Sequence, residues 1–159
     1  MDRTDWVKLA ASLAICFVAA LLGSIPISLA DGVAWQNTLD KPFFAPPDWL
    51  FGPAWTLLFI LMAVALFLVW RKWPAEGTKL ALGLFAVQIV LNVLWNYIFF
   101  GGRMIFGGLI EIVVLLVAIA ATTWAFYKVD RRAAYLMVPY LLWVCFATAL
   151  NAGIWLLNR

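Results

Sequence analysis

The sequence predicts an all-α integral membrane protein in which five transmembrane helices form one bundle, and three observations support this fold class. Of the 159 residues, 67% are hydrophobic and 12% are charged, a composition too apolar for an ordinary soluble domain. The mean hydropathy is +1.00. Finally, the chain contains five apolar runs of about 20 residues, and each is long enough to cross a hydrocarbon core of about 30 Å.

The first run, residues 7–30, is expected to be a retained transmembrane helix. It is longer than the apolar core of a typical signal peptide, and the preceding segment DRTDWVK carries charges of both signs. The N-terminal run is therefore counted as the first of the five spans.

The other four spans are expected at residues 49–70, 80–100, 104–127 and 133–157. Short connections, RKWPAEGTK, GGR and KVDRR, separate these runs. Short connections favour antiparallel packing of sequential helices. Because no internal repeat or long linker is visible, residues 1–159 are expected to form a single domain.

The segment 31–48, DGVAWQNTLDKPFFAPPD, is too polar and too rich in proline to span a membrane. It is expected to form a long loop between the first two helices that caps a pocket at the outer end of the bundle. Prolines 42, 46 and 47 stiffen this loop and reduce the entropy lost when it closes over a ligand.

The net charge of +3 does not indicate a nucleic-acid-binding protein, because the basic residues cluster at helix ends. Eight of the 11 fall on one side of the predicted membrane and three on the other. The positive-inside rule then predicts a cytoplasmic N-terminus, with the C-terminus and the 31–48 loop outside the cytoplasm. The larger group is Arg3, Lys8, Arg71, Lys72, Lys79, Lys128, Arg131 and Arg132; the smaller is Lys41, Arg103 and Arg159.

The two cysteines, Cys16 and Cys145, lie inside apolar runs and are expected to be buried, inert thiols. No metal site is expected. The chain has no histidine, which is the commonest protein ligand of haem iron, so only Tyr140 or a cysteine remains as a weak ligand.

Polar and aromatic side chains form stripes on two of the predicted helices. In the third run, Gln88, Asn92 and Asn96 follow at spacings of four, with Trp95 and Phe99 beside them. Amides in hydrocarbon should point into the bundle, either as interhelical hydrogen bonds or as parts of a binding site. The fifth run carries a similar stripe of Tyr140, Trp143, Ala147 and Asn151.

Two further features have both a structural and a functional interpretation. Trp55 and Phe59 lie on one face of the second run, where they suit either an apolar core or a pocket wall. Glu111 is the one carboxylate well inside an apolar run. It is a functional candidate, or it ties the fourth helix to the third through a hydrogen bond.

Together these stripes predict one pocket in the outer half of the membrane, beneath the 31–48 loop. Aromatic walls with a few amides suit a flat, mostly apolar ligand. The prediction depends on the helices bringing their indoles and amides to the same depth.

At these residues the chain resembles the translocator protein family, also called tryptophan-rich sensory proteins. The resemblance covers nearly the whole chain and is carried by KPFFAPPDWLFGPAW, LNVLWN and VPYLLWVCFATALN. It implies a five-helix bundle, commonly a homodimer, that binds porphyrin or haem. By motif position it places Trp55 and Trp143 in the pocket, with further wall residues Pro46, Asn96, Phe99 and Ala147 and the loop residues Trp35 and Phe44.

The expected function is therefore that of a membrane receptor or sensor for tetrapyrroles, surrounded by membrane lipid, with a role in tetrapyrrole transport or regulation. No cofactor is expected to be required, and porphyrin or haem is the ligand. An alternative is an enzyme that degrades porphyrin by photo-oxidation, with Trp55 and Trp143 as its catalytic candidates. The sequence offers neither a nucleophile–base pair nor a redox-cofactor motif for other chemistry.

Overall fold

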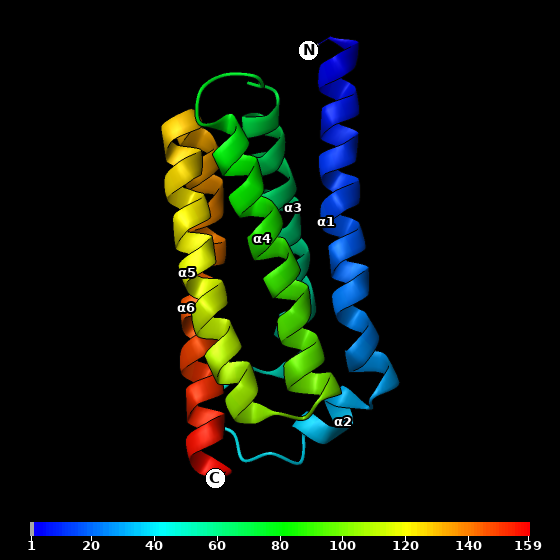
Figure 1. Cartoon of the computed structure of the whole chain (residues 1–159). Coiled ribbons are helices and arrows are strands. Elements are labelled where there is room, and N and C mark those ends of the chain that lie inside the picture. Colours follow the sequence, from blue (N-terminus) through cyan, green and yellow to red (C-terminus); the bar gives the residue numbers. More distant parts are fainter. Residues whose placement is uncertain (1) are drawn as a thin grey trace.

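The computed structural model describes residues 2–159, and this part of the chain is helical without β-strands (Figure 1). Five helices are long and apolar enough to cross a membrane, which confirms the predicted five-span fold. The elements are α1 (Arg3–Leu29), α2 (Gly32–Gln36), the 3-10 turn η1 (Asp48–Leu50), α3 (Phe51–Trp70), α4 (Thr78–Asn96), the π-helical turn η2 (Tyr97–Gly101), α5 (Ile105–Val129) and α6 (Arg131–Leu157).

The helices pack as a closed ring in the order α1, α3, α6, α5, α4 and back to α1. The predicted antiparallel neighbours are found for α4 with α5 and for α5 with α6. The pair α3 and α4 is an exception, because these helices make few contacts with each other despite their short connection. Helix α1 contacts both of them and closes the ring between them.

The connection between α5 and α6 is shorter than expected, because most of KVDRR is helical and only Asp130 separates the two helices. Its carboxylate accepts a hydrogen bond from Arg132 N at 2.9 Å and lies 3.1 Å from Lys72 Nζ. Desolvation alone would raise the pKa of Asp130. The hydrogen bonds and the positive charge of Lys72 outweigh it and hold that pKa below its usual value.

The end of the bundle that carries the N-terminus is densely packed. Val69, Ile119, Phe126 and Met137 are fully buried there. The rings of Phe85 and Phe126 stack with centroids 5.9 Å apart. This packing fixes the helices at one end and leaves their loop-side halves free to carry a site.

The last turn of the third span widens into the π-helical turn η2, where Gly102 N bonds to Tyr97 O at 2.8 Å. The wider turn buries two consecutive rings, Phe99 and Phe100. Such turns inside helices often occur at functional sites. Nothing in the apolar pattern of the sequence indicated this one.

Candidate functional site

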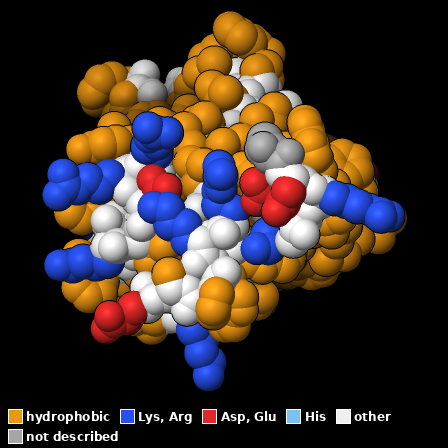
Figure 2. Space-filling model, turned by 90° about the horizontal axis from the view of Figure 1, so that it is seen from above, with side chains coloured by type: hydrophobic (Ala, Val, Ile, Leu, Met, Phe, Trp, Pro, Cys, Tyr) orange, Lys and Arg blue, Asp and Glu red, His pale blue; other side chains and the backbone are white. Residues whose placement is uncertain are grey.

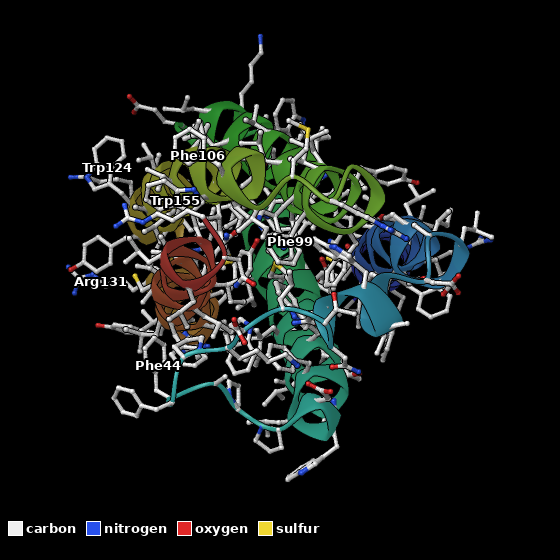
Figure 3. All side chains as sticks on the ribbon, turned by 90° about the horizontal axis from the view of Figure 1, so that it is seen from below. Phe44, Phe99, Phe106, Trp124, Arg131 and Trp155 are labelled. Atoms are coloured by element: carbon white, nitrogen blue, oxygen red, sulfur yellow. The ribbon has the colours of Figure 1, made fainter. Side chains whose placement is uncertain are left out.

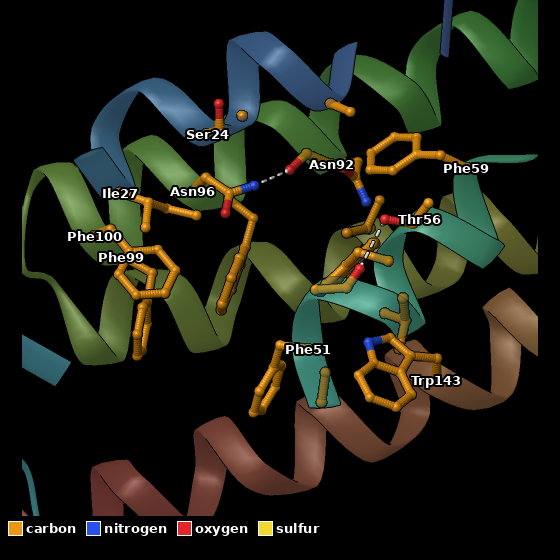
Figure 4. Close-up of a pocket in the computed structure, with 18 of the residues that line it drawn as sticks. Ser24, Ile27, Phe51, Thr56, Phe59, Asn92, Asn96, Phe99, Phe100 and Trp143 are labelled. Atoms are coloured by element: carbon orange, nitrogen blue, oxygen red, sulfur yellow. Dashed lines mark hydrogen bonds between the residues drawn. The ribbon is translucent and has the colours of Figure 1, made fainter. Parts of the chain in front are cut away.

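The candidate site is a cavity of about 930 Å³ between α1, α3, α4 and α6, in the loop-side half of the bundle (Figure 4). Its wall is mainly apolar. Three asparagines, Asn92, Asn96 and Asn151, are among its few polar side chains. A cavity of this volume lies at the upper end of the range typical of small-molecule sites.

Two indoles form one wall of the cavity. Trp55 of α3 and Trp143 of α6 meet edge to face with ring centroids 6.5 Å apart. Phe59 lies one turn from Trp55, at 5.8 Å, and Phe51 lies 5.9 Å from Trp143. Edge-to-face contacts of this kind stabilise aromatic pairs, so the wall is a connected set of rings from two helices.

The wall from α4 is braced by the contact of Trp95 with α5 and α6. Its indole N–H lies 3.1 Å from Gly108 O and 3.3 Å from Asn151 Oδ1. The Trp95 ring stacks on Phe99 at 4.8 Å. A glycine is needed at position 108, because a Cβ atom there would lie 2.9 Å from the Phe99 ring.

The amides of the pocket also hold the helices together. Asn92 Nδ2 donates to Tyr140 Oη at 2.9 Å, and Tyr140 Oη donates to Gln88 Oε1 at 3.0 Å. Asn96 Nδ2 donates to Asn92 O at 3.1 Å (Figure 4). The structural and functional interpretations are therefore compatible for Asn92, which joins α4 to α6 and also lines the cavity, whereas the Asn96 bond lies within α4.

The segment between α1 and α3 reaches the cavity and is tied to the bundle. Val33, Gln36 and Asp48 are among the lining residues. Lys41 Nζ bonds to Asn37 Oδ1 at 3.0 Å and to Asp48 Oδ1 at 3.2 Å. These contacts fix the two ends of the proline-rich stretch relative to each other.

The C-terminal end of α6 also holds the segment between α1 and α3. Asn158 exchanges two hydrogen bonds with the backbone of Asp40. The ring of Pro42 lies so close to Gly153 that an added Cβ atom would approach it to 3.0 Å. The absence of a side chain at Gly153 thus permits the loop to lie on α6.

A model of the TspO/MBR family matches residues 12–156. The chain belongs to the TspO/MBR family. It is therefore an integral, multi-pass membrane protein, in agreement with its five apolar helices.

Relatives of this family resemble the chain over most of its length. It is 38% identical to the tryptophan-rich protein TspO of Archaeoglobus fulgidus over 154 residues, which cover 96% of this chain and 97% of the relative. It is 40% identical to the protein of that name from Chlorobaculum tepidum over 153 residues, 96% of each chain. The human translocator protein is 39% identical over 127 residues, 79% of this chain and 75% of its own.

Most of the site residues predicted for this family member do come together around the cavity. All five long helices contribute to it, α5 only through Ile112 and Leu115, and every predicted residue on α3 and η2 lies in its wall. The predicted residues that line the cavity are Trp55, Phe59, Asn92, Trp95, Asn96, Phe99, Trp143, Ala147 and Asn151.

Four predicted residues do not line this cavity. Tyr140 is fully buried behind Asn92, and Trp35 packs on the edge of Phe99 at 5.4 Å. Phe44 packs against Phe146 at 6.3 Å. Pro46 lines a separate, shallower groove of about 510 Å³, which shares Trp143 with the main cavity.

The contribution of α1 to the site was not predicted from the sequence. Cys16, Phe17, Gly23 and Ser24 line the cavity together with Leu13, Ala14, Ala20 and Ile27. The small residues of this helix were the available signal, since they let other groups approach its backbone. Gly23, for example, lies where an added Cβ atom would be 3.2 Å from Asn96 Nδ2.

The two cysteines and Glu111 differ in their burial. Cys16 is buried as expected, but Cys145 is exposed, so the prediction that both thiols are buried is wrong. Glu111 is buried, and neither of its oxygens nor Gln88 Nε2 has a hydrogen-bond partner among residues 2–159. The hydrogen bond proposed to tie Glu111 to the third span is therefore not formed within the described chain.

Proposed function

We propose that this protein is a membrane receptor or sensor that binds a porphyrin-like tetrapyrrole in the cavity between α1, α3, α4 and α6. Binding would serve tetrapyrrole transport or regulation. The observation that carries the proposal is the convergence of indoles and amides from three helices on one cavity of about 930 Å³. Stacking surfaces with few polar groups suit a flat, amphipathic ring system.

Recognition is proposed to depend on the macrocycle and not on its metal. The chain has no histidine. The hydroxyl of Tyr140 is already engaged with Asn92 and Gln88. Metal-free and metallated porphyrins should accordingly bind with similar affinity, and a large preference for haem would contradict this part of the proposal.

The 31–48 loop is proposed to cover the bound ligand. Support comes from Val33, Gln36 and Asp48, which line the cavity, and from the bonds that Lys41 makes to Asn37 and Asp48. A loop that is already ordered loses little entropy when a ligand binds. Lys41→Ala should therefore weaken binding while leaving the helices intact.

Fluorescence titration tests the proposed site. Purified protein is titrated with metal-free protoporphyrin and with haem, and tryptophan quenching is followed in the wild type and in Trp55→Phe and Trp143→Phe. Each of these two variants should bind the porphyrin more weakly, and the porphyrin should quench less of the tryptophan fluorescence. Trp49→Phe is the matched control, because Trp49 is 71% exposed and lies outside the cavity wall. Unchanged quenching in both pocket variants would place the ligand elsewhere.

The alternative function, photo-oxidative porphyrin degradation, is favoured by the contact between Trp55 and Trp143 at 6.5 Å. Both rings lie in the cavity wall, where each could donate an electron to a photoexcited porphyrin, with molecular oxygen as the oxidant that accepts electrons in the breakdown of the macrocycle. The test is the loss of porphyrin absorbance under light compared with darkness. Loss that continues in the Trp55→Phe/Trp143→Phe double variant would reject these residues as its catalytic groups.

Orientation and assembly remain predictions. The basic end of the bundle is proposed to face the cytoplasm, and a homodimer is the expected assembly. A membrane-impermeant thiol reagent should label Asp40→Cys in intact cells but not Glu76→Cys, both in a background without Cys145. Light scattering of the purified protein tests the dimer.

A further inference from the structure

Lysine and arginine side chains crowd the end of the bundle that carries the N-terminus and the α5–α6 connection (Figure 2). Acidic partners neutralise two of them. Arg71 lies 3.7 Å from Asp5, and Lys72 lies 3.1 Å from Asp130. The remaining cations of this end have no ion pair within residues 2–159, so the end carries uncompensated positive charge.

Two of the uncompensated cations are held over exposed aromatic rings. Lys128 Nζ lies 5.6 Å from the ring centroid of Trp124, and Arg131 Cζ lies 5.2 Å from that of Tyr127. Trp124 is 58% exposed and Tyr127 is 43% exposed. Trp124 and Arg131 project from the same outer side of the bundle (Figure 3). Such contacts position a cation without neutralising it.

An exposed apolar stripe on α5 leads to these cations. Its members recur at spacings of three and four and so share one helix face. From Val117 to Lys128 the helix rises about 16 Å, which is about half of the hydrocarbon thickness. The stripe is Ile110, Val113, Val117, Ala120 and Trp124, with Lys128 one turn further on.

We propose that Lys128 and Arg131, framed by Trp124 and Tyr127, bind the phosphate of an anionic glycerophospholipid whose acyl chain lies along the α5 stripe. The two cations attract a net negative headgroup, whereas the cation of a zwitterionic headgroup would be repelled. The stripe favours a lipid over free phosphate, because an acyl chain can contact its apolar side chains over about the depth of one leaflet. This lipid site is separate from the proposed tetrapyrrole cavity.

Native mass spectrometry of the full chain in detergent tests the site. Phosphatidylglycerol and phosphatidylcholine with the same acyl chains compete for the protein, and the ratio of bound lipids is measured. A juxtamembrane cation contributes about 1 kcal/mol, or about a fivefold preference. Lys128→Gln/Arg131→Gln should therefore reduce the ratio by about 25-fold, while Lys128→Arg/Arg131→Lys should retain it.

The matched control is Arg3→Gln/Lys79→Gln, which removes the same charge from exposed residues of this end without a ring beneath them. It should leave the lipid ratio nearly unchanged. An unchanged ratio in the Lys128/Arg131 variant, or an equal loss in the control, would overturn the site. Displacement of the lipid by inorganic phosphate would show an anion site that does not require a lipid, contrary to the proposal. Circular dichroism verifies that each variant is folded.

Discussion

The two halves of the bundle are filled differently. In the half that carries the N-terminus, aliphatic and aromatic side chains such as Ile119, Phe126 and Met137 are fully buried against neighbouring helices. In the loop-side half, Trp55 and Trp143 are only partly buried, because one side of each faces the cavity. The helices α3, α4, α5 and α6 are thus densely packed at one end, and together with α1 they surround a hollow at the other.

The difference shows how the hollow half can keep its shape without being filled. Its walls are braced by directional contacts, such as the bonds of Trp95 to Gly108 and Asn151 and the chain from Asn92 through Tyr140 to Gln88. Hydrogen bonds in an apolar interior are strengthened by the low dielectric. Close packing supplies the stability of one half, and polar bracing supplies the geometry of the other.

The largest effect is expected when a phenylalanine ring is removed, and the loss of stability should differ between the two halves. Phe126→Ala should cost about 3–5 kcal/mol of stability, because a fully packed ring leaves a cavity behind. Phe59→Ala removes a ring of the same size that already borders empty space, and it should cost clearly less. Denaturant unfolding in detergent measures both. Equal losses would contradict the contrast between a filled and a hollow half.

A smaller effect is expected from adding one methyl group to the braced wall. Gly108→Ala would place a Cβ atom 2.9 Å from Phe99, and such overpacking costs about 1–3 kcal/mol. Ligand affinity should fall as well, since Phe99 and Trp95 line the cavity. Gly83→Ala is the control, because no atom lies within 4 Å of its added Cβ. That control should be neutral or stabilising, as alanine favours helix over glycine.

The smallest expected effect concerns the charged cap of α6 at the packed end. Because the folded-state pKa of Asp130 lies below its usual value, its carboxylate stabilises the fold above the unfolded-state pKa. That contribution is lost as pH falls through the folded-state pKa. Asp130→Asn should lower the Tm at neutral pH, and the difference from wild type should shrink below about pH 4.

Asp31→Asn is the control for this pH dependence. Asp31 occupies the N-cap position of α2, but its side chain makes no cap hydrogen bond. The Tm difference between Asp31→Asn and the wild type should be small at neutral pH, and it should not shrink at acid pH as the difference for Asp130→Asn does. A constant Tm difference for Asp130→Asn down to acid pH would show that the effect is not electrostatic.

Hydropathy and spacing were sufficient to predict the spans and the main indoles and amides of the cavity wall. Amides at spacings of four cannot face hydrocarbon, so Asn92 and Asn96 had to point inward. The aromatic residues Trp95 and Phe99 beside them followed the same face. Apolar positions carry no such signal, because lipid is as apolar as a protein core. Cys145 was therefore wrongly predicted to be buried, and the wall from α1 was missed.

The loop could not be placed from the sequence because contacts far along the chain determine its path. Pro42 lies against Gly153, and Asp40 bonds to Asn158. Phe44 consequently packs on α6 instead of lining the cavity. Local stiffness from the prolines was predictable, but the surface on which the stiff segment rests was not.

Filling the cavity with a bulky side chain is the sharpest test of whether the porphyrin binds between α1, α3, α4 and α6. Ala147→Trp would place an indole in the cavity wall on α6, whereas Leu156→Trp adds the same group at a position of α6 that is 52% exposed. Binding of metal-free protoporphyrin to both variants is measured by absorbance titration. Ala147→Trp should abolish binding, whereas Leu156→Trp should bind like the wild type. Undiminished binding by a folded Ala147→Trp variant would contradict binding of the porphyrin in this cavity.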